Sequence, residues 1–152
     1  MNRSLPALRR SVVAGALSVL LLSACQSMEP KMAAQPSLYD RLGGQPAITA
    51  VVDDFVGNVA ADGRINGFFA NANIPRLKVL LVQQICQGAG GPCTYGGRDM
   101  QVAHKGMHIN DAQFAALVED LVKTLDKFKV PEREKNELLA ALGPMKPSIV
   151  GQ

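Results

Sequence analysis

The chain of 152 residues contains no tryptophan, only two histidines and three cysteines, and few aromatic residues. The histidines lack the intervening acid of a His-Glu-x-x-His motif, which excludes that class of metalloprotease, and no Cys-x-x-Cys redox motif is present. No segment alternates apolar and polar residues with period two, so a β-sheet is not expected. Internal repeats and flavin or nicotinamide motifs are missing as well. These absences favour a single all-α domain that carries no reductase of its own.

The longest apolar run lies near the start of the chain, between Ser11 and Leu22, and three arginines precede it. A charged start, an apolar middle of about a dozen residues and small residues before a cut are typical of a secretory signal. Because Leu22-Ser23-Ala24 leads into Cys25, the segment resembles a bacterial lipoprotein signal, which implies that residues 1–24 are removed and Cys25 is lipidated. The alternative is an uncleaved N-terminal anchor. Both interpretations place the domain in the bacterial cell envelope, outside the cytoplasm and attached to a membrane.

Removal of the signal changes the charge balance and exposes a tether. The Lys and Arg count falls from 16 to 13, against 13 Asp and Glu, so the net charge of +3 belongs to the signal. A nucleic-acid partner is therefore not expected. Residues 25–37 have no helical or strand period and contain two prolines, which predicts a flexible tether facing the periplasm or the exterior. Gln26 is not the aspartate that commonly marks inner-membrane retention, which favours the outer membrane.

Cysteine use follows from the same interpretation. With Cys25 lipidated, Cys86 and Cys93 remain as a pair in an oxidising compartment, which favours a disulfide between them. Glycines within residues 87–92 let the chain fold back over so short a distance. Such a short loop stabilises a fold only modestly, so the bridge is expected to fix a corner. Two free structural thiols are the alternative.

Apolar residues at steps of three and four predict the helices of one domain over residues 38–150. Capping residues and prolines mark where each helix begins and ends. The expected segments are a helix of about four turns from Pro46 to Asp62-Gly63, a packed corner at residues 65–69, a helix from Pro75 to the glycines after Cys86, a short turn at residues 100–104 ended by Gly106, a helix capped by Asn110 and Gln113 whose apolar stripe runs to Phe128, and a last helix opened by Pro131 and stopped at Gly143-Pro144.

An ordered set of short motifs runs along this whole domain. The motifs are Tyr39-Asp40-Arg41-Leu42-Gly43-Gly44, Asp54-Phe55, Phe68-Phe69, Gly90-Gly91-Pro92 with Tyr95 and Gly97, Met100, Ala103-His104 and Ile109. In this order they resemble the group 1 truncated haemoglobins. The resemblance implies a shortened globin, a two-over-two helical sandwich that holds haem (iron protoporphyrin IX) between its helix pairs. His104 matches the proximal iron ligand of the family, and a neutral imidazole suits haem iron.

The resemblance also implies the other haem contacts. Phe69 matches the phenylalanine that stacks on the haem ring, and His108 is expected to support the proximal side or to cap the following helix. Lys78, Tyr95 and Lys105 are candidates to bind the propionates. Ordinary core packing is the alternative role for the positions that match the pocket lining, which are Phe55, Ile85, Met100, Ile109, Phe114, Leu117 and Leu121.

The chain departs from the family pattern on the distal side. Members usually place a tyrosine directly after the phenylalanine that matches Phe55, and its hydroxyl hydrogen-bonds to dioxygen; this chain has Val56. The facing distal positions are Leu77 and Leu81, which cannot donate a hydrogen bond. A lost donor of roughly 1.5 to 3 kcal/mol predicts oxygen release about ten- to hundredfold faster than in tyrosine-bearing relatives. Gln84 could swing inward, although a surface or pocket-edge role is favoured.

Reversible binding of a diatomic gas, chiefly dioxygen, is the function that the resemblance favours. A second hypothesis is an enzyme that converts nitric oxide to nitrate or uses peroxide, which would need a partner reductase. A third is a haem or redox sensor with the disulfide as its switch. The last is a helical interaction module without haem. Fold alone does not decide among them.

Overall fold

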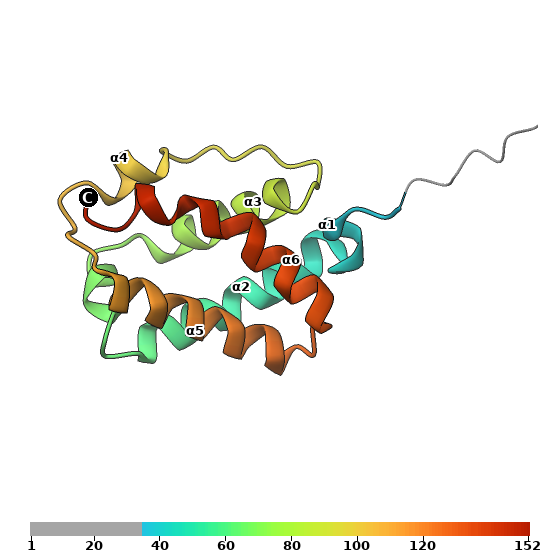
Figure 1. Cartoon of the computed structure of the whole chain (residues 1–152), viewed down its shortest axis with the longest axis horizontal. Coiled ribbons are helices and arrows are strands. Elements are labelled where there is room, and N and C mark those ends of the chain that lie inside the picture. The colour runs from blue at the N-terminus through green and yellow to red at the C-terminus, as the bar shows by residue number, and fades with distance from the viewer. Residues whose placement is uncertain (1–34) are drawn as a thin grey trace, which may run out of the picture. The chain divides into compact units, whose positions relative to one another are not determined.

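The computed structural model describes residues 35–152, and this part of the chain is built entirely of helices (Figure 1). The predicted lipoprotein signal, Cys25 and most of the predicted tether lie outside the described residues. No helix within residues 35–152 is long and apolar enough to cross a membrane. In chain order the elements are α1 (Leu38–Arg41), α2 (Gly44–Ala61), the 3-10 helix η1 (Asn66–Phe69), α3 (Ile74–Gly88), α4 (Met100–His104), α5 (Asp111–Lys127), α6 (Glu132–Leu142) and the 3-10 helix η2 (Gly143–Ser148).

The helices begin where side chains can satisfy the first main-chain N–H groups. Asn110 accepts a hydrogen bond from the Gln113 N–H at 2.9 Å, and Gln113 accepts one from the Asn110 N–H at 3.0 Å, which forms the predicted capping box of α5. Asn73 caps α3 in the same way, accepting from the Arg76 N–H at 3.0 Å, with Pro75 in the first turn. These two predicted helix starts are confirmed.

The turn between α1 and α2 requires glycine. Gly43 has a φ of +92°, in the left-handed region that other residues rarely adopt, and a Cβ atom there would lie 2.9 Å from the Cβ of Ala47. The first turn of α2 therefore leaves no room for a side chain at Gly43. Arg41 then fastens α1 to α6, because its Nε donates to the carboxylate of the buried Glu134 at 2.9 Å.

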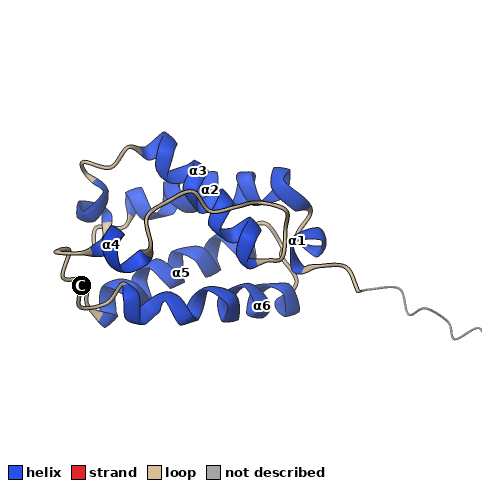
Figure 2. Ribbon diagram, turned by 90° about the horizontal axis from the view of Figure 1, so that it is seen from above, coloured by secondary structure: helices blue, strands red, loops and turns tan. Residues whose placement is uncertain are grey.

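The core forms around α2, which packs on α3 and on α5, while α3 also contacts α6 (Figures 1 and 2). Apolar residues at helical spacing bury one whole side of α2. Helices α3, α5 and α6 close over this side. The fully buried members of the core include Val52, Cys86, Ala116, Leu125 and Leu138.

The structure differs from the sequence predictions at the end of α5. Phe128 was expected to continue the apolar stripe of α5, but α5 ends at Lys127 and the Phe128 side chain is 41% exposed. Lys129, with a φ of +54°, turns the chain away from the helix direction. The predicted stop at Gly143-Pro144 is confirmed, because α6 ends at Leu142; the chain then continues as the separate 3-10 helix η2, in whose first turn proline is tolerated.

A long irregular connection links α3 to α4. Residues 89–99 run back along α3 toward its N-terminal end, where α4 begins (Figures 1 and 2). Beyond α4, the last residues of the described chain pair with the segment that follows His104. The His108 N–H donates to the Gln152 carbonyl at 2.8 Å, and the Gly151 N–H donates to the Ile109 carbonyl at 2.9 Å.

Candidate functional site

His104 is the last residue of α4, a helix of five residues whose start is capped by Asp99. Its Nδ1 atom lies 2.7 Å from the main-chain carbonyl of Met100, and the side chain is half-buried. A carbonyl oxygen can only accept, so this contact assigns a proton to Nδ1, and in the neutral imidazole the lone pair then lies on Nε2. A histidine held in this tautomer by a main-chain carbonyl is ready to ligate a metal through Nε2.

The donor set around His104 fits haem. Within residues 35–152 no group of three or more His, Cys, Asp or Glu side chains is placed to hold a metal ion. Haem needs only an axial imidazole from the protein, because the porphyrin supplies the equatorial nitrogens. His104, with its fixed tautomer, meets that single requirement.

His108 does not join His104. It lies beyond the end of α4, has a φ of +50°, and exposes its side chain. Its main-chain N–H, rather than its ring, makes the bond to Gln152. His108 therefore acts through its main chain on the path of the segment after α4. The imidazoles of His104 and His108 do not form one site.

The predicted pocket-lining residues divide by burial. Val56 and three of the lining positions belong to the well-buried core, whereas the others are half-buried and come from η1, α3, α4, α5 and the segment before α5. Half-buried apolar side chains are the kind of surface that a flat apolar cofactor covers. Of this set, Phe69, Leu81 and Leu117 pack against the core cluster. The buried residues are Phe55, Val56, Ile85 and Leu121, and the half-buried ones are Phe69, Leu77, Leu81, Met100, Ile109, Phe114 and Leu117.

The distal positions offer no hydrogen-bond donor from their side chains. Val56 is buried, and Leu77 and Leu81 are half-buried on α3. Gln84, one turn further along α3, is engaged elsewhere. Its amide nitrogen lies 3.3 Å from the sulfur of Met100 and 3.2 Å from the sulfur of Met145, so the side chain connects α3 to α4 and η2.

The propionate candidates have protein partners or lie in solvent. Lys78 pairs with Asp53 of α2 at 2.9 Å, and Lys105 is exposed just after α4. The Tyr95 hydroxyl donates to the Arg98 carbonyl at 3.0 Å. Burial raises the pKa of Tyr95, and the charges of Arg98 and Arg76 oppose that rise.

Three residues near the site were missed at the sequence level. Arg76 in the first turn of α3 and Arg98 before α4 both act on the pKa of Tyr95, and their positive charge would suit propionates. Their signal was present, because both are basic residues next to predicted site positions. Met145 carried no such signal, since it reaches Gln84 across 61 residues of sequence.

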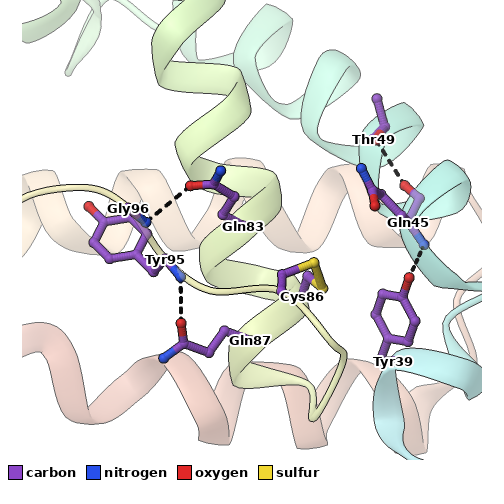
Figure 3. The surroundings of a disulfide bond; sticks show 9 residues. Tyr39, Gln45, Thr49, Gln83, Cys86, Gln87, Tyr95 and Gly96 are labelled. Carbon is purple, nitrogen blue, oxygen red and sulfur yellow. Dashed lines mark hydrogen bonds between the residues drawn. A yellow bond between two sulfur atoms is a disulfide. The ribbon is translucent and has the colours of Figure 1, made fainter.

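A disulfide joins Cys86, at the end of α3, to Cys93 in the connection to α4 (Figure 3). The two Cα atoms are 5.7 Å apart. Cys86 is fully buried. Gly91 faces the bridge so closely that a Cβ atom would lie 2.7 Å from the Cys86 sulfur and 2.5 Å from the ring of Tyr39. Only glycine leaves room for both neighbours.

Two glutamines of α3 hold the same connection (Figure 3). The Gln87 side-chain oxygen accepts from the Tyr95 N–H at 2.6 Å, and the Gln83 side-chain oxygen accepts from the Gly96 N–H at 3.1 Å. We call these two hydrogen bonds, together with the Cys86–Cys93 disulfide, the α3 clamp. It fixes residues 93–96 along α3, a few residues before α4 begins.

Comparison with known proteins decides the family. Residues 37–150 match the bacterial-like globin family. The chain belongs to the truncated haemoglobins. The group 1 truncated haemoglobin GlbN of Mycolicibacterium paratuberculosis is 36% identical over 113 residues, which cover 74% of this chain and 83% of that protein. The GlbN protein of Synechocystis is 35% identical, with 70% of this chain and 90% of the relative covered.

Solved structures of this globin family agree with the fold. Truncated haemoglobin from Tetrahymena pyriformis in the Fe(III) form superposes with a TM-score of 0.74 and 31% identity, over 77% of this chain and all of that one. The 2/2 haemoglobin from Synechococcus, solved in the cyanomet state with covalently attached heme, gives a TM-score of 0.72 and 30% identity, also over 77% of this chain and all of that one. The predicted all-α, two-over-two globin fold is confirmed, and haem is the cofactor of this family.

Proposed function

We propose that this globin binds haem through His104 and binds a diatomic gas, chiefly dioxygen, reversibly at the iron. The proposal is carried by the imidazole of His104, whose Nδ1 proton is held by the Met100 carbonyl at 2.7 Å and whose Nε2 is left free. Bound haem supplies an iron with an open position for a gas ligand. The protein supplies the axial nitrogen and apolar side chains that exclude water from the pocket.

The distal side chains set how long a gas ligand stays. Val56, Leu77 and Leu81 can pack against such a ligand but cannot donate to it. The Gln84 amide is occupied by two methionine sulfurs. Dioxygen is therefore expected to dissociate quickly. The protein is suited to carry dioxygen with fast binding and release rather than to store it tightly.

An absorption spectrum tests the haem proposal. Protein reconstituted with hemin is expected to show a Soret band in the ferric, ferrous and carbon monoxide forms, and His104→Ala is expected to lose it. His108→Ala is the matched control, because its exposed ring lies outside the site, and it should keep the full spectrum. Colourless protein that refuses hemin, or an unchanged spectrum in His104→Ala, would overturn the proposal.

The enzymatic and sensing alternatives make different predictions. Rapid mixing of the oxygen-loaded protein with nitric oxide separates a carrier from a scavenger, and turnover with a supplied reductant would favour the enzyme. For a redox sensor, the buried Cys86 sulfur is an unfavourable leaving group, because burial disfavours the thiolate. The structure thus favours a structural bridge over a switch.

We also propose that the domain is held at the bacterial cell envelope by a lipid on Cys25. The support is the sequence alone, a charged and apolar start that leads into a cysteine. Labelled palmitate should be incorporated into the wild-type protein expressed in a bacterial host, and Cys25→Ala should abolish both the label and the membrane fractionation. A cytoplasmic, unlabelled wild-type protein would contradict this location.

A further inference from the structure

We propose that the α3 clamp positions His104, with Gln83 and Gln87 acting as positioning residues through the connection that leads into α4. The inference rests on the proposed role of His104 as the iron ligand. It assigns a purpose to two glutamines whose contacts no motif of the sequence explains.

The first step is the short path from the clamp to the ligand. Gly96 is bonded to Gln83, and only residues 97–99 separate it from Met100, the first residue of α4. The carbonyl of Met100 accepts from the His104 imidazole at 2.7 Å. Movement of the main chain at residues 95–96 therefore reaches the group that orients the imidazole.

The second step is the stiffness of this path. The Tyr95 hydroxyl donates to the Arg98 carbonyl at 3.0 Å, and the ring lies over Gly97 so closely that a Cβ atom there would collide with it. Asp99 then accepts from the Val102 N–H at 2.9 Å and fixes the start of α4. Two of the three residues between the clamp and α4, Arg98 and Asp99, thus make hydrogen bonds, and the Tyr95 ring crowds the third, Gly97, which limits how far this segment can absorb a displacement.

The third step is the choice of glutamine. An irregular connection has no helical partners for its N–H groups, so those groups need acceptors from elsewhere. The carboxamide oxygens of Gln83 and Gln87, one turn apart on α3, supply acceptors for two adjacent N–H groups. Because α3 also carries Leu77 and Leu81, one helix sets the geometry of both sides of the proposed haem.

The test compares wild type with a double variant that carries both Gln83→Leu and Gln87→Leu. This variant lacks both acceptor oxygens and keeps the disulfide. In the protein without haem, amide exchange at Tyr95 and Gly96 is expected to become about tenfold faster, the effect of losing a hydrogen bond of ordinary strength. In the ferrous haem-loaded protein, the iron–histidine stretching band should shift or broaden, and hemin loss should be about tenfold faster. A role confined to folding would not move that band.

Two further variants act as controls. Gln83→Glu with Gln87→Glu keeps an acceptor oxygen at each position and is expected to restore the wild-type band. Gln45→Leu removes an exposed glutamine of α2 whose main chain, rather than side chain, makes the bonds drawn in Figure 3, and it should leave every measurement unchanged. If the double leucine variant does not fold, the single variants carry the same comparison.

The outcomes separate this inference from the proposed function. Faster amide exchange with an unchanged iron–histidine band overturns the positioning role, and unchanged amide exchange overturns the clamp itself. If the protein takes up no haem at all, the proposed function fails. The His104 ring resonances of the haem-free protein then decide: their broadening in the double variant supports the positioning role, and unchanged resonances reject it.

Discussion

The two sides of the proposed haem site differ in how many polar contacts hold their side chains. On the side of α4, His104 is held by the Met100 carbonyl, the Asp99 cap and the α3 clamp. On the side of α2 and α3, the predicted distal positions are Val56, Leu77 and Leu81, whose side chains have no hydrogen-bond donor. The difference teaches that the polar contacts of this globin concentrate around His104, the proposed iron ligand, whereas the proposed gas-binding side has no side-chain donors. Four changes would break or sharpen this contrast.

Loss of the imidazole should have the largest effect. His104→Ala removes the imidazole that is proposed to ligate the iron and that the Met100 carbonyl orients. Added imidazole, which can enter the space left behind, is expected to restore part of the Soret band. A variant whose hemin affinity stayed within a factor of about two of wild type would show that the α4 side does not hold the iron.

Reduction of the Cys86–Cys93 bridge should have the next largest effect. The closed loop is short, and the chain-entropy estimate for such a loop is about 2 to 3 kcal/mol of unfolding free energy. Urea denaturation of the oxidised and the reduced protein measures this difference. Both forms should carry haem, because Gln83 and Gln87 still hold Tyr95 and Gly96. Complete loss of haem on reduction would mean that the disulfide alone secures the α4 side.

A donor added to the other side should slow oxygen release. Val56→Tyr adds a hydroxyl at the buried position of α2 that is predicted to face the ligand, and a good donor is expected to slow dissociation about ten- to hundredfold. Val56→Phe adds the same bulk without the hydroxyl and is the matched control. Stopped-flow measurement of oxygen dissociation compares the two. Equal rates in both variants would show that the distal face is not limited by a missing donor.

A substitution at Asp120, away from both sides of the proposed haem site, should change the stability of the fold without changing haem binding. Asp120 on α5 is 7% exposed, and its Oδ2 atom has no hydrogen-bond partner within the described residues. Burial, and then the charge of Asp62, raise the pKa of this carboxyl. Asp120→Asn is expected to stabilise the fold by about 1 kcal/mol at neutral pH and to leave hemin binding unchanged.

The sign of the pH dependence follows from the raised pKa. Between the unfolded value of about 3.9 and the higher folded value, the native state binds more protons, so wild-type stability falls as pH rises through this window. The advantage of Asp120→Asn should therefore shrink as pH is lowered toward 4. Asp111→Asn, at an exposed carboxylate at the start of the same helix that does not act on the pKa of Asp120, is the control, and a pH-independent difference between Asp120→Asn and wild type would reject the explanation.

The sequence predicted those parts of this molecule that depend on local patterns. Asn110 with Gln113 and Pro75 with Asn73 mark helix starts by their own chemistry, and the apolar spacing along α2 predicts its buried side. The same spacing failed at Phe128, because periodicity cannot show that the backbone turns at Lys129. His104 and the lining positions came from the order of motifs in a known family.

Contacts between distant polar groups could not be predicted in this way. Gln83 and Gln87 are unremarkable residues on a helix until the connection folds back against them. The link from Gln84 to Met145 joins two segments whose proximity only the tertiary structure creates. Polar contacts of this kind have no period and no motif, so they become visible only when the chain is folded.

The crowding at Gly91 has a consequence for the chemistry of the bridge. Gly91 lies between the ring of Tyr39 and the sulfur of Cys86. The Tyr39 N–H also donates a hydrogen bond to the Ala89 carbonyl at 2.8 Å, which holds α1 against this corner. Cys86 is fully buried and Cys93 is half-buried, so a dithiol attacks the bridge at the Cys93 sulfur and Cys86 is the leaving thiolate. Because burial disfavours a thiolate at Cys86, the rate of reduction depends on how readily Tyr39 and α1 loosen over this sulfur, and it can be followed in the intact protein without any label.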